Sequence, residues 1–321
     1  MVLDSPETER LIDAAGYASE AWVAVGVRLP DSTVLVSRGG GVSGFDCDSL
    51  AYAGSLTKQV TGACAALLEH DGALDIERPI ATWLPELPAW ARTIRVRHLI
   101  HHTAGLPGSL ALWESMKQAG ESDWTSDGVI AALSIVPELA SSPGTTYDYS
   151  NAGYVCLARI LERATDEGLA TFAQEQLLDP AGMSASLLWS GPDPHPPAAR
   201  LPESSRPPAA LSLGDGGLWT TVRDLLRWND ALRVDMFGIS DVVHTTGRLD
   251  DGAPLDYAWG VRVIDRGSDR IQSHGGSWGE TAAKLVRLPD RGASLASLAP
   301  VGGAERMIAL SSLLEDALLA G

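Results

Sequence analysis

The chain has 321 residues, 45% of them hydrophobic, and a net charge of −17. So acidic a chain, without a basic run, cannot displace the counterions of a nucleic-acid backbone, which argues against a nucleic-acid partner. Its cysteines show no Cys-x-x-Cys spacing, and no apolar run reaches the roughly eighteen residues of a membrane-spanning helix. The N-terminal region lacks a basic start followed by an apolar stretch, so we expect no secretory signal, no membrane association and a cytoplasmic location.

The hydrophobic pattern predicts strands at both ends of the chain and helices between them. A first helix begins at Ser5-Pro6, and strands at 22–27 and 33–36 flank a turn at Pro30-Asp31. A helix then runs from Ser55 to Asp71-Gly72. The later elements are expected helices at 95–101, 126–135, 152–163, 168–177 and 221–232, a proline-rich surface loop at 191–208, strands at 258–265, 270–273, 282–288 and 294–299, and a final helix through 307–317.

This order implies an α/β fold in which both termini build one sheet and a mainly helical subdomain is inserted. We expect residues 1–73 and 212–321 to form a discontinuous α/β subdomain and residues 74–211 to form the helical one. A ligand cleft is expected between the two.

Ser55 and Lys58 form the first candidate chemical element. Residues three apart on a helix are neighbours, so the lysine amine can reach the serine hydroxyl and serve as its base. The pattern Ser-x-x-Lys is short, and by itself it is a weak signal.

Tyr149 and Asn151 form the second element, just before the helix expected at 152–163. A phenol beside cationic groups can move protons between nucleophile and leaving group, and an amide can hold a substrate carbonyl or Lys58. The alternative is that Asn151 or Ser150 caps the helix and the tyrosines pack in the core.

The third element is the stretch His274-Gly275-Gly276-Ser277-Trp278, between two expected strands. Glycines there allow a substrate to approach an edge strand whose free N–H groups can stabilise an oxyanion. The stretch also contains Gly-x-Ser-x-Gly, which makes Ser277 a rival nucleophile. Chain order argues against it, because no histidine follows Ser277 as the α/β-hydrolase arrangement requires.

Ser-x-x-Lys, Tyr-x-Asn and His-x-Gly in this order resemble the serine β-lactamase and penicillin-binding-protein superfamily, in particular its class C branch with D-alanyl-D-alanine carboxypeptidases and family VIII esterases. Stretches at 72–76, 83–85, 99–106 and 216–221 are also similar to that family. The resemblance implies an antiparallel sheet flanked by helices, as in β-lactamases and transpeptidases. It also implies acylation of Ser55, proton transfer by Lys58 and Tyr149, orientation by Asn151, and an oxyanion hole from the N–H groups of Ser55 and Ser277.

His274 departs from the family pattern, since β-lactamases usually carry a lysine there to bind a substrate carboxylate. A histidine is mostly neutral at pH 7, so strong β-lactam hydrolysis is not expected. The resemblance therefore implies a serine hydrolase of small esters or amides that needs no cofactor. The alternatives are an acyltransferase or amide synthase, a D-amino-acid peptidase or weak β-lactamase, and a silent binding protein.

The remaining candidates have plainer explanations. His98, His101 and His102 lack the His-Glu-x-x-His spacing of a zinc site, so no metal is expected, and they shape the turn that follows. The glycine-rich stretch around Asp215 lacks the preceding strand of a phosphate loop and is interpreted as a turn beside the cleft. Trp278 follows the expected oxyanion residue and is the best candidate for lining an apolar acyl pocket.

Overall fold

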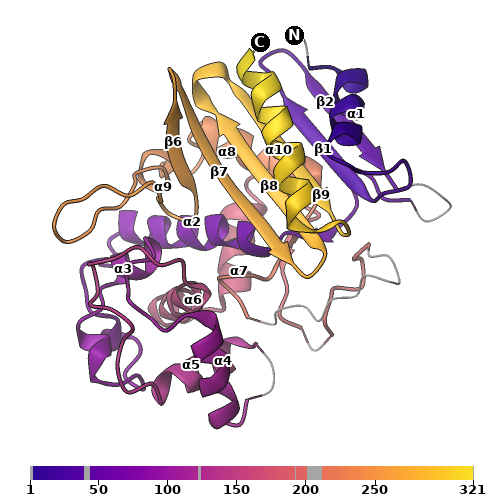
Figure 1. Ribbon diagram of the computed structural model, residues 1–321. Coiled ribbons are helices and arrows are strands. Elements are labelled where there is room, and N and C mark those ends of the chain that lie inside the picture. Colours follow the sequence, from indigo (N-terminus) through magenta and orange to yellow (C-terminus); the bar gives the residue numbers. More distant parts are fainter. Residues whose placement is uncertain (1–2, 40–43, 122–123, 192, 201–211, 321) are drawn as a thin grey trace.

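A six-stranded sheet forms the centre of the computed structural model, which describes residues 3–39, 44–121, 124–191, 193–200 and 212–320 (Figure 1). The strand order is β2-β1-β9-β8-β7-β6, and every neighbouring pair is antiparallel. The strands are β1 (Val23–Arg28), β2 (Thr33–Arg38), β6 (Arg262–Arg266), β7 (Asp269–Trp278), β8 (Thr281–Leu288) and β9 (Ala293–Ala299). The prediction of an α/β fold whose sheet draws on both ends of the chain is confirmed.

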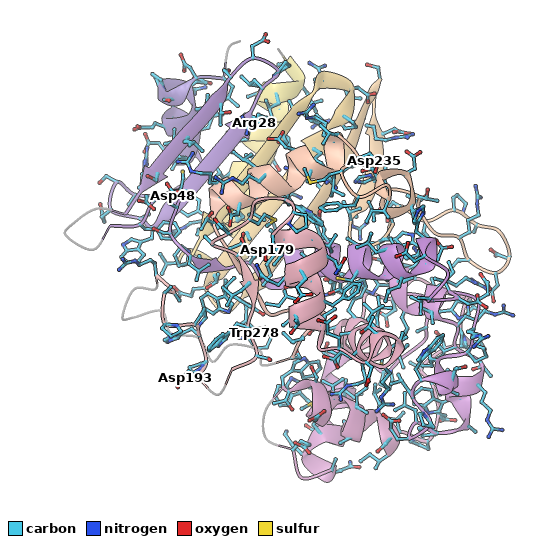
Figure 2. The ribbon with its side chains drawn as sticks, turned by 180° about the vertical axis from the view of Figure 1, so that it is seen from behind. Arg28, Asp48, Asp179, Asp193, Asp235 and Trp278 are labelled. Carbon is cyan, nitrogen blue, oxygen red and sulfur yellow. The ribbon has the colours of Figure 1, made fainter. Side chains whose placement is uncertain are left out.

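Helices cover both faces of this sheet, because its strands alternate side chains between two apolar cores. On one face lie α1 (Ser5–Ala14) and α10 (Gly303–Ala320), over the core that contains Val286. On the other face lie α8 (Val222–Arg233) and α2 (Thr57–His70), over the core that contains Leu285. Figures 1 and 2, which view opposite sides, show α10 in front of the sheet in one and α8 in the other.

The segment between β2 and α8 is mainly helical, as predicted. Its helices are α3 (Val96–Ile100), α4 (Ser109–Gln118), α5 (Ser126–Ser134), α6 (Asn151–Thr165) and α7 (Leu169–Ala173), which continues into a π-helical turn at Gln174–Leu178; short 3₁₀ turns lie at Ile80–Thr82 and Ala89–Arg92. A small sheet, β3-β5-β4, joins β3 (Ala51–Tyr52), β5 (Leu218–Thr220) and β4 (Leu187–Leu188). The subdomain boundaries 1–73, 74–211 and 212–321 stay a prediction.

Several details differ from the expected elements. Helix α4, the short α9 (Ser240–Val243) and the small sheet were not predicted, and β6 begins at Arg262 rather than near residue 258. The later start has a local cause, since the Ala258 N–H bonds back to the Val261 carbonyl across Gly260, whose φ is +83°. The predicted loop at 191–208 lies partly outside the described residues.

Helix α2, which leads away from Ser55, is fixed by close backbone packing. A Cβ on Gly62 would lie 2.3 Å from the Trp259 carbonyl oxygen, and one on Gly260 would lie 2.1 Å from the Lys58 carbonyl oxygen. Only glycine permits this contact. The helix is therefore held in a set position relative to the segment that leads into β6.

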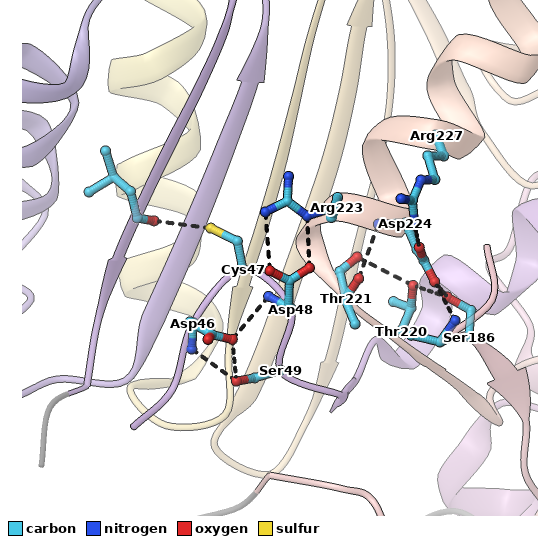
Figure 3. A network of polar contacts seen from close by, with 12 residues as sticks. Asp46, Cys47, Asp48, Ser49, Ser186, Thr220, Thr221, Arg223, Asp224 and Arg227 are labelled. Atoms are coloured by element: carbon cyan, nitrogen blue, oxygen red, sulfur yellow. Dashed lines mark hydrogen bonds and ion pairs between the residues drawn. The ribbon is translucent and has the colours of Figure 1, made fainter. Parts of the chain in front are cut away.

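The start of α8 is anchored by a polar network that ties three segments together (Figure 3). The Thr221 hydroxyl caps the helix by accepting from the Asp224 N–H at 3.0 Å. Asp224 in turn accepts from the Ser186 hydroxyl at 2.8 Å, and Arg223 pairs with Asp48 at 2.7 Å. This network fixes the junction of β5 and α8 against the chain that precedes β3 and Ser55.

Candidate active site

Ser55 lies in a 3₁₀ turn, η1 (Gly54–Leu56), that runs directly into α2. Gly54 has a φ of +53°, and its carbonyl oxygen accepts a 2.6 Å hydrogen bond from the Thr57 hydroxyl. The left-handed conformation turns the chain sharply out of β3, a geometry that favours glycine. Ser55 is thus placed at the N-terminal end of the helix, as the sequence predicted.

Lys58 is fully buried, and three acceptors surround its amine. The Nζ atom lies 3.1 Å from Ser55 Oγ, 2.8 Å from Asn151 Oδ1 and 2.9 Å from the backbone oxygen of Asp215. Nζ also lies 4.9 Å from the centre of the Tyr149 ring. The structure therefore brings together Ser55, Lys58, Tyr149 and Asn151, which stand in two distant parts of the sequence.

This arrangement gives the Lys58 amine a direction for proton transfer. The amide oxygen of Asn151 and the Asp215 carbonyl can only accept, so each fixes one N–H of the lysine. The remaining position on Nζ faces Ser55 Oγ. A neutral amine presents its lone pair there and can take the serine proton, and an ammonium presents an N–H there and can return it.

The Tyr149 side chain is 39% exposed, and its hydroxyl makes no hydrogen bond within the described part of the chain. Behind it stands the buried His102, with ring centres 4.3 Å apart. Ser150 caps α6 by accepting from the Gly153 N–H at 3.1 Å. The capping alternative thus holds for Ser150, whereas the Asn151 side chain contacts Lys58.

His102 holds the Tyr149 segment in place, a role that sequence reasoning missed. Its Nδ1 accepts from the Ser150 N–H at 3.1 Å, and its backbone oxygen accepts from the Asp148 N–H at 2.8 Å. Burial, and secondly the charge of Lys58, holds the pKa of His102 well below its usual value. The His102 ring is therefore neutral. In the sequence, only the family-like stretch at 99–106 pointed to a role for this residue.

The edge of β7 supplies the candidate oxyanion hole. β6 pairs with β7 only as far as Ser273, so the stretch from His274 to Trp278 is not covered by β6. A Cβ on Gly276 would lie 2.9 Å from the Ser55 nitrogen, and one on Gly54 would lie 2.8 Å from the Ser277 nitrogen. The backbone nitrogens of Ser55 and Ser277 thus lie on closely packed segments, which is compatible with the predicted two-donor oxyanion hole.

Ser277 itself is less suited to be the nucleophile. Its side chain is exposed and makes no hydrogen bond to a base within the described ranges, whereas Ser55 has Lys58 at 3.1 Å. A serine without an adjacent base remains a weak nucleophile.

His274 is buried behind this edge and is held as one neutral tautomer. Its Nδ1 lies 2.6 Å from the Gly275 carbonyl oxygen, which can only accept, so Nδ1 carries the proton. Its Nε2 then accepts from the Tyr257 hydroxyl at 3.0 Å. Burial, and then the charge of Lys58, lowers the pKa of His274 to about 3, so this position carries no positive charge at pH 7.

Asp215 is a second residue whose contribution sequence reasoning missed. The turn around it was predicted, and the structure shows that its carbonyl binds Lys58. Its buried carboxylate accepts from the Ser212 hydroxyl at 2.6 Å and from the Trp124 indole at 3.3 Å. Burial raises the pKa of this carboxyl, and the Lys58 charge opposes the rise.

A cavity of about 620 Å³ opens beside Ser55 and runs along β7 toward α10. Its lining includes Tyr149, His274, Gly275, Gly276 and Ser277. Trp278 packs instead against the small cluster of Leu50, Tyr52 and Trp219. Its place in an acyl pocket stays a prediction.

The three neighbouring histidines do not converge. His98 Nδ1 accepts from the Arg95 N–H, His101 Nδ1 lies 3.3 Å from the Tyr257 carbonyl, and His102 faces Ser150. Over the described residues, no group of three or more His, Cys, Asp or Glu side chains is arranged to hold a metal ion. Over the same residues, no helix is both long and apolar enough to cross a bilayer.

Comparison with known proteins places this geometry in a family. The chain is 31% identical to penicillin-binding protein 4* of Bacillus subtilis over 271 residues, which cover 76% of this chain and 59% of that protein. It is 28% identical to a D-aminopeptidase of Brucella ovis, covering 70% of this chain and 44% of that protein. The chain thus spans about half the length of these curated relatives.

A solved structure, the D-amino acid amidase from Ochrobactrum anthropi SV3, superimposes with a TM-score of 0.78 at 21% identity, covering 98% of this chain and all of that one. At such identity the likeness shows the fold alone, and membership of the class C branch stays a prediction. A family model described as Beta-lactamase matches residues 19–307. That match covers most of the chain, which therefore belongs to the β-lactamase family of serine hydrolases.

Proposed function

We propose that the protein forms an acyl-enzyme on Ser55 and hydrolyses small amides or esters. The observation that carries this proposal is the buried amine of Lys58, 3.1 Å from Ser55 Oγ and fixed on its other sides by Asn151 and Asp215. A buried lysine held against a single hydroxyl is arranged to activate it.

In the proposed reaction, Ser55 Oγ attacks the substrate carbonyl and gives its proton to the neutral Lys58 amine. The N–H groups of Ser55 and Ser277 stabilise the tetrahedral oxyanion. The bond between the carbonyl carbon and the leaving nitrogen or oxygen then breaks. Tyr149, whose ring lies beside the Lys58 amine, gives its proton to the leaving amine or alcohol and regains one from the Lys58 ammonium, which leaves the acyl ester on Ser55. Water then attacks the ester by the reverse proton path, which releases the acid and restores Ser55.

The neutral His274 supports amides and esters over β-lactams as substrates, since it offers no fixed charge for a carboxylate. The similarity to a D-aminopeptidase favours an amide or peptide with a D-residue as the second candidate substrate. Transfer of the acyl group to an amine or alcohol remains the alternative to hydrolysis. Product partition between water and an added amine separates the two.

Labelling with a fluorophosphonate, read by peptide mass spectrometry, tests the nucleophile. We expect the adduct on Ser55, loss of labelling in Ser55→Ala, and unchanged labelling in the matched variant Ser277→Ala. An adduct on Ser277, or full esterase activity in Ser55→Ala, would overturn the assignment. Paired D- and L-aminoacyl p-nitroanilides, with short p-nitrophenyl esters beside them, then rank the substrate classes.

A further inference from the structure

A row of polar side chains crosses the sheet on the face that α8 covers. The strand register pairs Gln272 with Arg287, Arg287 with Ser294, and Ser294 with Arg28, so that one row runs through β7, β8, β9 and β1. Side chains of directly paired residues lie on the same face of a sheet. Two and four residues before Arg287 on β8, the same face carries the core residues Leu285 and Ala283, so an arginine occupies a core position.

The Arg287 side chain is buried without a counter-ion. The residue is 6% exposed, and none of the ion pairs among the described residues involves its guanidinium. Its Nη2 bonds to His244 Nε2 at 2.7 Å, whereas Nε and Nη1 have no partner in the described part of the chain. An unsatisfied buried charge is costly, so a partner for these N–H groups is expected.

His244 does not supply the missing negative charge. Its Nδ1 lies 2.6 Å from the Ser240 carbonyl oxygen and so carries the proton, which leaves Nε2 to accept from Arg287. Burial, and then the charge of Arg287, lowers the pKa of His244 to about 3. The pair therefore has a full positive charge at neutral pH.

These groups line a cavity of about 230 Å³ between α8 and the sheet. Arg28 and Arg233 also line it, and its one lining carboxylate, Asp230, is already engaged by Arg28 at 2.9 Å and by Arg233 at 3.5 Å. Figure 2 labels Arg28 on the side of the sheet where α8 lies. The lining thus carries an excess of positive charge.

The unpaired donors of Arg287 form a fork of the kind that binds an oxyanion, and they are enclosed by protein atoms, so an anion in the cavity reaches them only when the Arg287 side chain turns toward it. The Arg287 Nη2 has two hydrogens, and His244 uses one of them. The other hydrogen stands parallel to either the Nε–H or a free Nη1–H, so a fork for two oxygens remains in both cases. The buried Ser294 hydroxyl, which has no partner in the described chain, adds a donor next to Arg287 in the row.

We propose that this cavity binds a small oxyanion, a carboxylate or a phosphate, in a fork donated by Arg287 with help from Ser294. The site is separate from the Ser55 cavity, since the two share no lining residue. Bound there, the anion completes the hydrogen bonding of Arg287 and links β8 to β9. The proposal does not depend on the proposed hydrolase function.

Isothermal titration calorimetry of the whole chain tests the site, with inorganic phosphate and with acetate at constant ionic strength against a sodium chloride control. We expect saturable binding of at least one oxyanion with a Kd in the range of about 1 mM or below. Binding of phosphate alone would identify a tetrahedral oxyanion as the ligand, and binding of acetate would identify a carboxylate. Arg287→Lys keeps the charge but loses the fork, so it should bind about tenfold or more weakly. Ser294→Ala should weaken binding less.

The matched control is Arg270→Gln, which removes an exposed arginine of β7 that pairs with Asp265 outside the cavity. It should bind as the wild type does. If neither anion binds saturably, the cavity holds only water and the proposal fails. It also fails if Arg287→Lys and Ser294→Ala, both folded by circular dichroism, bind as tightly as the wild type, or if chloride gives the same response.

Discussion

Replacing Gly276 by alanine probes the candidate oxyanion hole through the backbone alone. A Cβ at this position would lie 1.9 Å from the Ala53 carbonyl oxygen and 2.9 Å from the Ser55 nitrogen. Both are backbone atoms, one in η1 and one in the residue just before it, so the clash cannot be relieved by the rotation of a side chain. The β7 edge and the Ser55 turn must separate.

The size of this separation sets the expected effect. To move from 1.9 Å to an ordinary contact above about 3.0 Å, the two segments must part by roughly 1 Å. Oxyanion donors act at about 2.7–3.1 Å, so one of the two is lost or badly aimed. Loss of one such donor costs about 10²- to 10³-fold in kcat, or about 3–4 kcal/mol of transition-state stabilisation.

The assay is the rate of acylation by a short p-nitrophenyl ester, with circular dichroism to confirm folding. Gly168→Ala is the control, because a Cβ there would meet nothing within 4 Å, its φ is −64°, and it does not line the Ser55 cavity. We expect Gly276→Ala to lose at least about 10²-fold and Gly168→Ala to stay within about threefold. Similar acylation rates in both variants would refute the oxyanion-hole geometry.

Three further outcomes are expected. Burial lowers the pKa of His101, His244 and His274 to about 4, 3 and 3, so the unfolded chain, but not the folded one, takes up protons as the pH falls below about 6.5. Stability should be full above that pH and drop by about 2 kcal/mol per histidine at pH 5; equal urea midpoints at pH 7 and pH 5 would contradict this. Asn151→Leu removes the oxygen that accepts a 2.8 Å hydrogen bond from Lys58, and it should lower kcat/KM about 10²-fold. An acylation rate equal to that of the wild type would contradict this expectation. Chromogenic cephalosporins should be turned over far more slowly than short p-nitrophenyl esters, a difference that efficient cephalosporin hydrolysis would disprove.

The sequence predicted the fold well where hydrophobic period and breaker residues agreed. The helix after Ser55 and the strands β8 and β9 lie within a few residues of their expected bounds, because each has a strong apolar pattern. It missed α4, the short α9 and the two- and three-residue strands of the small sheet. The four-residue α9 and these strands are specified by tertiary packing rather than by their own pattern. Helix α4 has ten residues but buries only Leu112 and Met116, so its apolar pattern is weak.

The candidate site was predictable where side chains carry the chemistry. Ser55, Lys58, Tyr149 and Asn151 could be named from their types and order. The roles of His102 and Asp215 could not, because each contributes through a backbone group or a contact with backbone far away in sequence. No local pattern encodes such a contact.

The charge that Lys58 carries explains why a neutral His274 is compatible with this site. Lys58 is already a buried cation in the folded structure when it holds the serine proton, and its charge contributes to the low pKa of His274. A lysine at that position would bring a second ammonium close to the Lys58 amine, and like charges repel. A neutral imidazole, held by the Tyr257 hydroxyl, fills the space without that repulsion. The neutral imidazole therefore offers no charge to a substrate carboxylate and adds no repulsion beside Lys58, in keeping with the proposed hydrolysis of uncharged amides or esters.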